Sequence, residues 1–193
     1  ELAVLSGTDA PAIYNVTSYA TELLVDSDFN GSADSAGLRA NATGQDWYES
    51  REVTPALLTL DTATVGGNAT RKAKLLAANP ATGENAYLTQ EFSSPQTGTF
   101  WAETDIYVDS ITNLPDNPDR TAFLLIGDNT DPTRTGPNSD DPERFVYLAF
   151  YKDGGGSTGT MDLVARDRDD TWTGFTTIAS GLNLKQWYTI RVV

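Results

Sequence analysis

Alternation of side-chain character over residues 99–109 places the strongest constraint on what this chain folds into. Even-numbered positions such as Phe100, Ile106 and Val108 are apolar. The odd-numbered positions hold aromatic and acidic side chains, namely Trp101, Glu103, Asp105, Tyr107 and Asp109. A period of two residues is that of a β-strand. We therefore expect a strand with one face in a core and an aromatic, acidic surface on the other.

Similar stretches, each closed by Gly, Pro, Asn or Asp, run from residue 23 to the end of the sequence. No helical stretch of comparable length interrupts them, so the sequence predicts an all-β fold. Residues 72–76 are expected to pair with residues 87–92 across a turn at 79–83. Residues 121–127 are apolar on both faces and are expected to be central in a sheet. The expected strands are 23–25, 47–53, 57–60, 72–76, 87–92, 99–109, 121–127, 144–152, 161–168, 176–179 and 187–193.

Composition narrows the classes of function. The chain has no Cys and no His, which excludes disulfides, thiol chemistry and hydrolases that depend on serine, cysteine or histidine catalysis. Its formal net charge of −14 disfavours nucleic acids and anionic membrane surfaces as partners, because both would be repelled. No apolar run is long enough to cross a bilayer. The charge instead favours cations and neutral ligands. A neutral glycan or a neighbouring protein subunit as partner is compatible with it.

The 193 residues suit a single domain with a sizeable core. Residues 1–21 are small, polar and broken by Gly7 and Pro11, so they are expected to form an N-terminal arm or linker before a domain over residues 22–193. Triplets of the form Asn-X-Ser/Thr crowd the first part of the chain. With the absence of Cys, they favour a secreted or cell-surface glycoprotein. The candidate attachment sites are Asn15, Asn30, Asn41 and Asn68.

A series of segments follows one order along the chain: 28–31 (Asp-Phe-Asn-Gly), 72–76, 100–108, 123–127, 147–154, 163–166 and 187–191 (Trp-Tyr-Thr-Ile-Arg). This order resembles the concanavalin A-like lectin and glucanase superfamily, including its laminin G-like modules. The resemblance covers about residues 23–193. It implies a two-sheet antiparallel β-sandwich of the jelly-roll type, whose opening strand pairs with a late strand. In such proteins further strands normally follow the Trp-Tyr strand.

The last expected strand, residues 187–193, ends the sequence without a turn or cap. We expect it to be an unpaired edge strand, so that the domain is incomplete or is completed by a partner. Either the parent chain supplies the missing strands, or a segment of a neighbour pairs there, with residues 12–19 of the arm as the donor. Head-to-tail donation would make the chain a structural subunit of a filament, a homo-oligomer formed by strand addition.

The resemblance also implies a concave face that binds sugar. Aromatic rings stack on the C–H faces of sugars, while carboxylates and Arg bind the hydroxyls. The alternative is that Trp101 and Tyr107 pack under a loop and the acids are solvated. The candidate ligand-binding residues are Trp101, Glu103, Asp105 and Tyr107, with Tyr147, Tyr151, Arg166 and Arg191 as neighbours from adjacent strands.

Glu103 and Asp105 are also candidates for catalysis. Residues i and i+2 of a strand lie roughly 6.5 to 7 Å apart, and glycosidases place their carboxyl groups roughly 5 to 9.5 Å apart. Laminarinase-type members of the superfamily use a third acid, however, and here that position is Tyr107 or Val108. A polysaccharide lyase using Tyr with Arg166 or Arg191 is the other enzymatic alternative, which the acidic charge of the chain disfavours.

A loop that begins at Asp26 has the oxygen ligands of a calcium loop. Gly31 stands at its sixth position, but the twelfth, which should be Glu, is Gly37. The alternative is a plain turn. Relatives of the implied fold often bind calcium nearby, so a structural calcium ion is a candidate cofactor. Its ligands would be Asp26, Asp28, Asn30 and Asp34.

The leading hypothesis from the sequence is a non-enzymatic extracellular β-sandwich that binds glycan or forms part of a larger surface protein. Its two alternatives are a structural subunit joined by strand addition, and a glycoside hydrolase or polysaccharide lyase that acts through Glu103 and Asp105.

Overall fold

The computed structural model shows a chain built mainly from antiparallel strands. It describes residues 3–4, 29–41, 47–49, 57–76, 88–90, 99, 101–113, 119–127, 144–169 and 171–193. These residues include one short helix, α1 (Ser35–Ala40). The strands are β1 (Ala3–Val4), β2 (Tyr48–Glu49), β3 (Leu58–Asp61), β4 (Lys72–Leu75), β5 (Leu88–Thr89), β6 (Ala102–Tyr107), β7 (Arg120–Gly127), β8 (Arg144–Tyr151), β9 (Thr160–Asp169), β10 (Thr171–Trp172), β11 (Thr176–Asn183) and β12 (Trp187–Val192).

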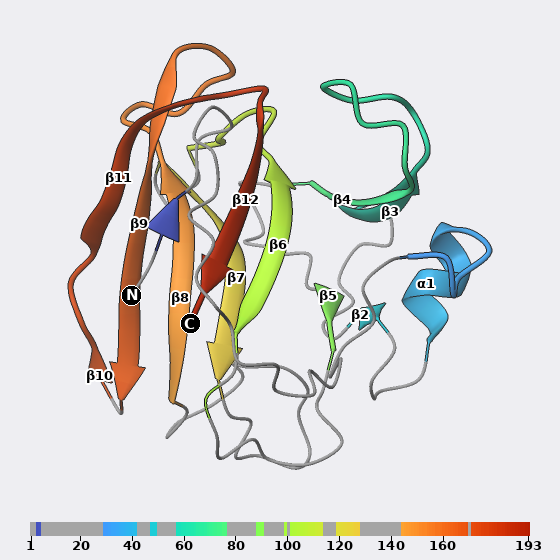
Figure 1. Ribbon diagram of the computed structural model, residues 1–193, viewed down its shortest axis with the longest axis horizontal. Coiled ribbons are helices and arrows are strands. Elements are labelled where there is room, and N and C mark those ends of the chain that lie inside the picture. The colour runs from blue at the N-terminus through green and yellow to red at the C-terminus, as the bar shows by residue number, and fades with distance from the viewer. Residues whose placement is uncertain are drawn as a thin grey trace, which may run out of the picture.

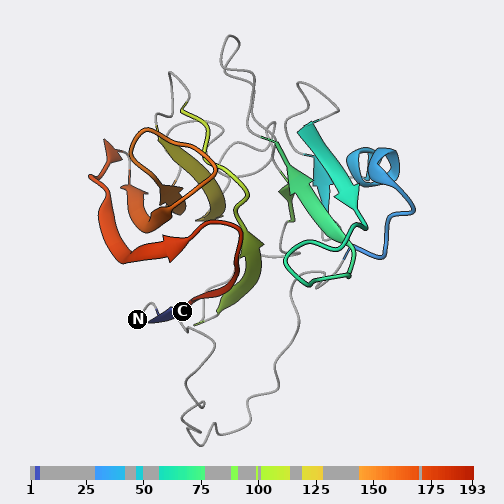
Figure 2. The same ribbon diagram turned by 90° about the horizontal axis from the view of Figure 1, so that it is seen from above.

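Two sheets make up the larger part of the described structure. One has five strands in the order β10-β9-β8-β7, with β11 also paired to β9, and the other has three in the order β1-β12-β6. In Figure 1, β12 and β6 lie in front of β8 and β7. The two small antiparallel pairs β2–β5 and β3–β4 gather with α1 on the other side of β6 (Figure 2). The predicted all-β class is thus confirmed. No helix in these described ranges has the length and apolarity to cross a membrane.

The main core lies where the two larger sheets meet. Phe150 of β8 and Leu163 of β9 are fully buried, and they share one cluster with Tyr188 and Ile190 of β12. Val108, at the end of β6, belongs to the same cluster. Alternation along each strand puts every second side chain into this cluster and turns the others outward. Each main sheet therefore has an outer face directed away from the core.

Helix α1 lies in a turn-rich part of the sequence, residues 26–46, where no helix was expected. Asp34 is the N-cap, and its Oδ1 accepts a hydrogen bond from Gly37 N at 2.8 Å. Leu38 is 1% exposed and anchors the helix, while Ser35 Oγ accepts a hydrogen bond from Leu60 N of β3. A helix of six residues is too short to show a 3.6-residue pattern, so no periodic signal marks it in the sequence.

The expected pairing of residues 72–76 with residues 87–92 is wrong. β4 pairs with β3, and β5 pairs with β2. The connection from β3 to β4 contains a tight turn at Gly66 and Gly67, both at positive φ (53° and 84°), between the bridged residues Val65 and Asn68. A Gly-Gly pair is a favoured two-residue hairpin turn. This turn draws β4 back onto β3.

The apolar character of residues 121–127 predicted a central strand, and this prediction is wrong for β7. Within the described residues it lies at the end of the five-stranded sheet and pairs with β8 alone. Apolar side chains on both faces of a strand indicate that both faces are covered, and they carry no information on how many strands flank it. The prediction took coverage of both faces of the strand as a sign that strands flank it on both edges.

The last strand is not the free edge that was expected. β12 lies between β6 and β1, with Ala3 opposite Arg191 and Val4 opposite Ile190. The start of the N-terminal arm thus pairs with this strand within the same chain. The expected donor segment 12–19 and the expected strand 23–25 lie outside the described residues.

Candidate functional site

The acidic side chains of β6 lie on the outer face of the three-stranded sheet. Ile106 packs against the main core, whereas Glu103 and Asp105, which are out of phase with it, are exposed. Trp101 directly precedes the strand and is 50% exposed. These positions have the outward orientation that the alternation predicts.

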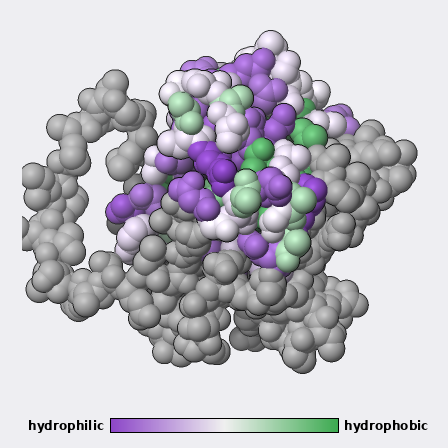
Figure 3. Space-filling model, turned by 90° about the vertical axis from the view of Figure 1, so that its right-hand side faces the viewer, coloured by the Kyte–Doolittle hydropathy of each residue, from purple (hydrophilic) through white to green (hydrophobic). Residues whose placement is uncertain are grey.

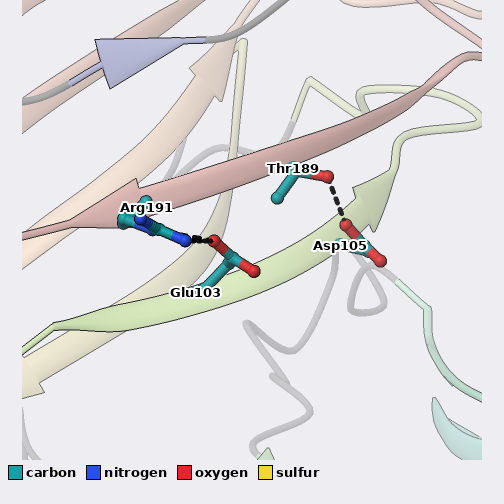
Figure 4. A network of polar contacts seen from close by, with 4 residues as sticks. All are labelled: Glu103, Asp105, Thr189 and Arg191. Atoms are coloured by element: carbon teal, nitrogen blue, oxygen red, sulfur yellow. Dashed lines mark hydrogen bonds and ion pairs between the residues drawn. The ribbon is translucent and has the colours of Figure 1, made fainter. Parts of the chain in front are cut away.

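The neighbouring strand β12 places one polar partner opposite each acid. Arg191 lies opposite Glu103, and its Nε donates a hydrogen bond to Oε2 of that residue at 2.8 Å, with Nη2 at 2.6 Å from the same oxygen. Thr189 lies opposite Asp105, and its Oγ1 donates a hydrogen bond to Oδ1 at 2.6 Å. Figure 4 shows the two pairs side by side along the strands. Exposed pairs of this kind contribute about 0–1 kcal/mol each to stability. In this structure they direct each acid toward its partner on β12.

Trp101 extends this row at one end. The guanidinium carbon of Arg191 lies 4.8 Å from the centre of the indole ring, a cation–π distance. Arg191 was expected as a neighbour of this face, and the structure places it there. We call Trp101, Glu103, Asp105, Thr189 and Arg191 the Trp101 face.

The other end of the same outer face is covered. The rings of Tyr107 and Trp187 lie 5.4 Å apart, and Trp187 Nε1 donates a hydrogen bond to Val65 O of the β3–β4 connection at 2.8 Å. The turn at Gly66 approaches both rings. Of the two alternatives from the sequence, packing under a loop therefore holds for Tyr107, while Trp101 stays half exposed.

Gly66→Ala is expected to lower the free energy of unfolding by about 2 kcal/mol. An added Cβ would lie 2.9 Å from Tyr107 Cε2 and 3.0 Å from Trp187 Cδ1, at a backbone φ of +53°. Both neighbours are rigid rings, so the hairpin would have to lift. Urea unfolding followed by tryptophan fluorescence measures the loss. Gly67→Ala has a similar positive φ but no atom within 4 Å, so it isolates the backbone cost, and an equal loss in both variants would contradict the close approach.

Three of the expected ligand-binding residues lie elsewhere. Tyr147 and Arg166 face each other across β8 and β9, and Tyr147 belongs to a second cluster with Ala149 and Val164, against which Tyr151 packs. Alternation puts this cluster on the outer face of the five-stranded sheet, because the intervening residues of both strands pack in the main core. The expectation of one continuous site is thus wrong, and the core separates the two groups.

Two residues that the sequence did not suggest complete this second group. The guanidinium carbon of Arg166 lies 4.5 Å from the Phe175 ring centre and 5.0 Å from that of Tyr147, and the guanidinium carbon of Arg120 lies 4.7 Å from the Phe175 centre. Burial lowers the pKa of Arg166, as does the charge of Arg120, while Tyr147 opposes the shift. Phe175 lies outside every expected strand, so no periodic signal marked it.

The expected calcium ligands are described only in part. Asp34 uses Oδ1 as the helix cap, Asn30 is described, and Asp26 and Asp28 lie outside the described residues. Among the residues that are described, no group of three or more acidic side chains could hold a metal ion. The calcium site stays a prediction.

The expected glycosylation sites differ in their surroundings. Asn41 Nδ2 donates hydrogen bonds to Ser32 Oγ at 2.9 Å and Trp47 O at 2.6 Å, so its amide nitrogen is engaged in the fold. Asn68 Oδ1 instead accepts from Thr70 N at 2.8 Å and Thr70 Oγ1 at 2.6 Å, and these contacts do not use the nitrogen to which a glycan attaches. Asn15 lies outside the described residues. Of Asn41 and Asn68, the latter is therefore the better suited to carry a glycan on the folded chain.

The side of the molecule that carries α1 and β3–β4 is mostly hydrophilic where the residues are described (Figure 3). Apolar side chains are scattered over it, and the larger exposed ones, Leu75 and Leu76, are 48% and 44% exposed. This described surface therefore gives no sign of a broad apolar docking patch.

No family model, no curated protein and no solved structure matches this chain. The case for its function therefore rests on the geometry described above.

Proposed function

We propose that this chain is a non-enzymatic, glycan-binding β-sandwich of the jelly-roll type, secreted or displayed on a cell surface, alone or as a module of a larger protein. Its contact surface is the Trp101 face. One observation carries the proposal: a half-exposed indole continues a row of two fixed polar pairs on adjacent strands.

The chemistry of this face suits a neutral sugar. A sugar ring presents an apolar C–H face, which stacks on an indole such as that of Trp101, and hydroxyl groups that both donate and accept hydrogen bonds. Glu103 and Asp105 supply acceptors, and Arg191 supplies donors. Because the acids are already held by partners on β12, less side-chain freedom is lost on binding.

The arrangement favours binding over hydrolysis. A glycosidase needs a protonated carboxyl group and a second carboxylate around the scissile bond. Glu103 and Asp105 are instead exposed and paired with Arg191 and Thr189. The third acidic position of the laminarinase-type motif falls on Tyr107, which packs on Trp187, or on the next residue, which is buried in the core. This strand therefore supplies no third carboxylate.

Trp101→Ala is expected to weaken binding to a neutral glycan by about 30-fold, since truncating a central aromatic residue commonly costs at least about 2 kcal/mol of binding free energy. The ligand is first found with the wild-type chain on a glycan array, and its affinity is then measured by calorimetry. Ile178→Ala is the matched control. It removes an apolar side chain that is 37% exposed on β11 of the other sheet, and it should leave the affinity unchanged.

Two results would contradict the proposal. One is that the wild-type chain binds no neutral glycan on the array. The other is that Trp101→Ala binds the best neutral ligand as tightly as the wild type while remaining folded.

A further inference from the structure

Two arginines from different strands converge on one aromatic ring over the outer face of the five-stranded sheet. Arg120 begins β7, and Arg166 lies on β9, opposite Tyr147 of β8. Their guanidinium carbons lie 4.7 and 4.5 Å from the centre of the Phe175 ring. Neither strand neighbours the other, because β8 lies between them. The long side chains therefore reach the same ring from opposite sides of β8.

The centre of this cluster is small and apolar. Ala149 and Val164 are paired across β8 and β9 and are 0% and 5% exposed, and Phe175 packs against their cluster. Tyr147 meets Phe175 edge-on, with ring centres 5.8 Å apart. Tyr147 is only 7% exposed and supports Phe175 from within the cluster. Phe175 is partly exposed and has a guanidinium group at two sides, so it is the ring that a ligand can reach.

Arg120 is not neutralised within the described part of the chain. It makes no ion pair there, and its buried Nε has no hydrogen-bond partner. The Phe175 ring attracts the charge but accepts no hydrogen bond in the plane of the guanidinium group, so the buried Nε–H is left without an acceptor. The guanidinium carbons of Arg120 and Arg166 lie 4.7 and 4.5 Å from the same ring centre, so their like charges repel each other. A bound anion would satisfy the donors and cancel this repulsion.

We propose that this cluster, Arg120, Arg166, Phe175 and Tyr147, is a binding site for the carboxylate or sulfate group of an acidic saccharide. The anionic group accepts hydrogen bonds from the guanidinium of Arg120 and lies near that of Arg166. The sugar ring packs against the exposed part of Phe175. The site lies on the opposite outer face from the Trp101 face, so it is independent of the neutral-glycan proposal.

The net charge of −14 does not prevent such binding. At physiological ionic strength the Debye length is about 8 Å, so charges farther away on the surface are largely screened. A bound anionic group then responds mainly to the charges nearest to it, which include that of Arg120. The overall charge is expected to slow association with long polyanions, which makes short acidic oligosaccharides the suitable probes.

Calorimetry with a galacturonate trimer, a sulfated galactose trimer, a neutral galactose trimer and sodium sulfate tests the proposal. At least one acidic trimer is expected to bind. The neutral trimer and sulfate alone are expected to bind at least tenfold more weakly than that trimer. Arg120→Gln should weaken acidic-trimer binding at least about tenfold, since hydrogen bonds to charged groups are lost. Lys74→Gln, which removes the same charge from an exposed position on β4, should change the affinity less than twofold.

A thermal measurement separates a binding role from a structural one. Without ligand, Arg120→Gln is expected to melt at or above the wild-type temperature, because it removes the repulsion. The acidic trimer should raise the melting temperature of the wild type and not of the variant. Should Arg120→Gln fail to fold, Arg166→Gln carries the same binding test.

Several outcomes would overturn the assignment. If neither acidic trimer binds at about 10 mM, the proposed site does not exist. That concentration corresponds to a binding free energy of about −3 kcal/mol. An equal loss in Lys74→Gln and Arg120→Gln would indicate general charge attraction instead. Binding of sulfate alone as tightly as the sulfated trimer would exclude a role for the sugar ring. None of these results bears on whether Trp101 binds neutral glycan.

Discussion

Phe150→Ala is expected to lower the free energy of unfolding by about 3–5 kcal/mol. Phe150 is 0% exposed, and its cluster draws Leu163 from the same sheet and Tyr188 and Ile190 from the three-stranded sheet. The truncation leaves a cavity where the two sheets meet. The loss therefore includes both the apolar area of the ring and the contacts that its neighbours make with it.

Urea unfolding of the two proteins, followed by tryptophan fluorescence, measures this difference. Ile178→Ala serves as the control, because Ile178 is 37% exposed and its truncation should change stability by no more than about 0.5 kcal/mol. A loss below about 1 kcal/mol in Phe150→Ala would mean that this residue does not join the two sheets. A loss of about the expected size would show that Phe150 holds the two sheets together. The outer faces of both sheets would then depend on the same core.

Lys72→Met is expected to lower the free energy of unfolding by about 3 kcal/mol. Lys72 is 8% exposed, and its Nζ donates hydrogen bonds to Ala63 O at 2.7 Å, Thr70 O at 2.6 Å and Asn68 O at 3.3 Å. The ammonium group thus gathers the carbonyls of the β3–β4 connection around one cation. Methionine keeps the apolar stem and leaves these carbonyls without their donor.

The effect of this change reaches the covered end of the same outer face, where Tyr107 and Trp187 lie. The same connection supplies Val65 O, which accepts the hydrogen bond from Trp187 Nε1, and Gly66, which covers the ring. Loosening the hairpin should therefore expose Trp187 and shift its fluorescence to longer wavelength. Lys74→Met, two residues along the same strand and exposed, should change neither stability nor fluorescence. An equal effect in both variants would show that the carbonyl cage does not stabilise the hairpin.

Local periodicity determined where most strands lie. The two-residue alternation at residues 101–108 turned Trp101, Glu103 and Asp105 outward and Ile106 inward, as the structure has them. This succeeded because the pleat of a strand depends only on the chain itself, and an exposed acid is stable on whichever face meets water. The polar half of the Trp101 face on β6 could accordingly be predicted from the sequence.

Partners across strands could not be predicted in the same way. Thr189 and Arg191 come to lie opposite Asp105 and Glu103 only because β12 pairs with β6 in one register. That register depends on contacts between residues far apart in the sequence. The pairing of β4 with β3 did have a local signal, the Gly66-Gly67 turn, which the sequence analysis overlooked.

The sequence by itself determined the all-β class, the positions of the main strands and the outward face of β6. Only the tertiary structure decided which outer face each remaining residue belongs to. Along β8 both faces carry large apolar or aromatic side chains, so Tyr147 and Phe150 look alike in the sequence, although one faces Arg166 and the other the main core. The physical reason is that alternation divides the side chains of a strand between its two faces but does not determine what covers each face. Packing of the other sheet against one face of β8 settles that question.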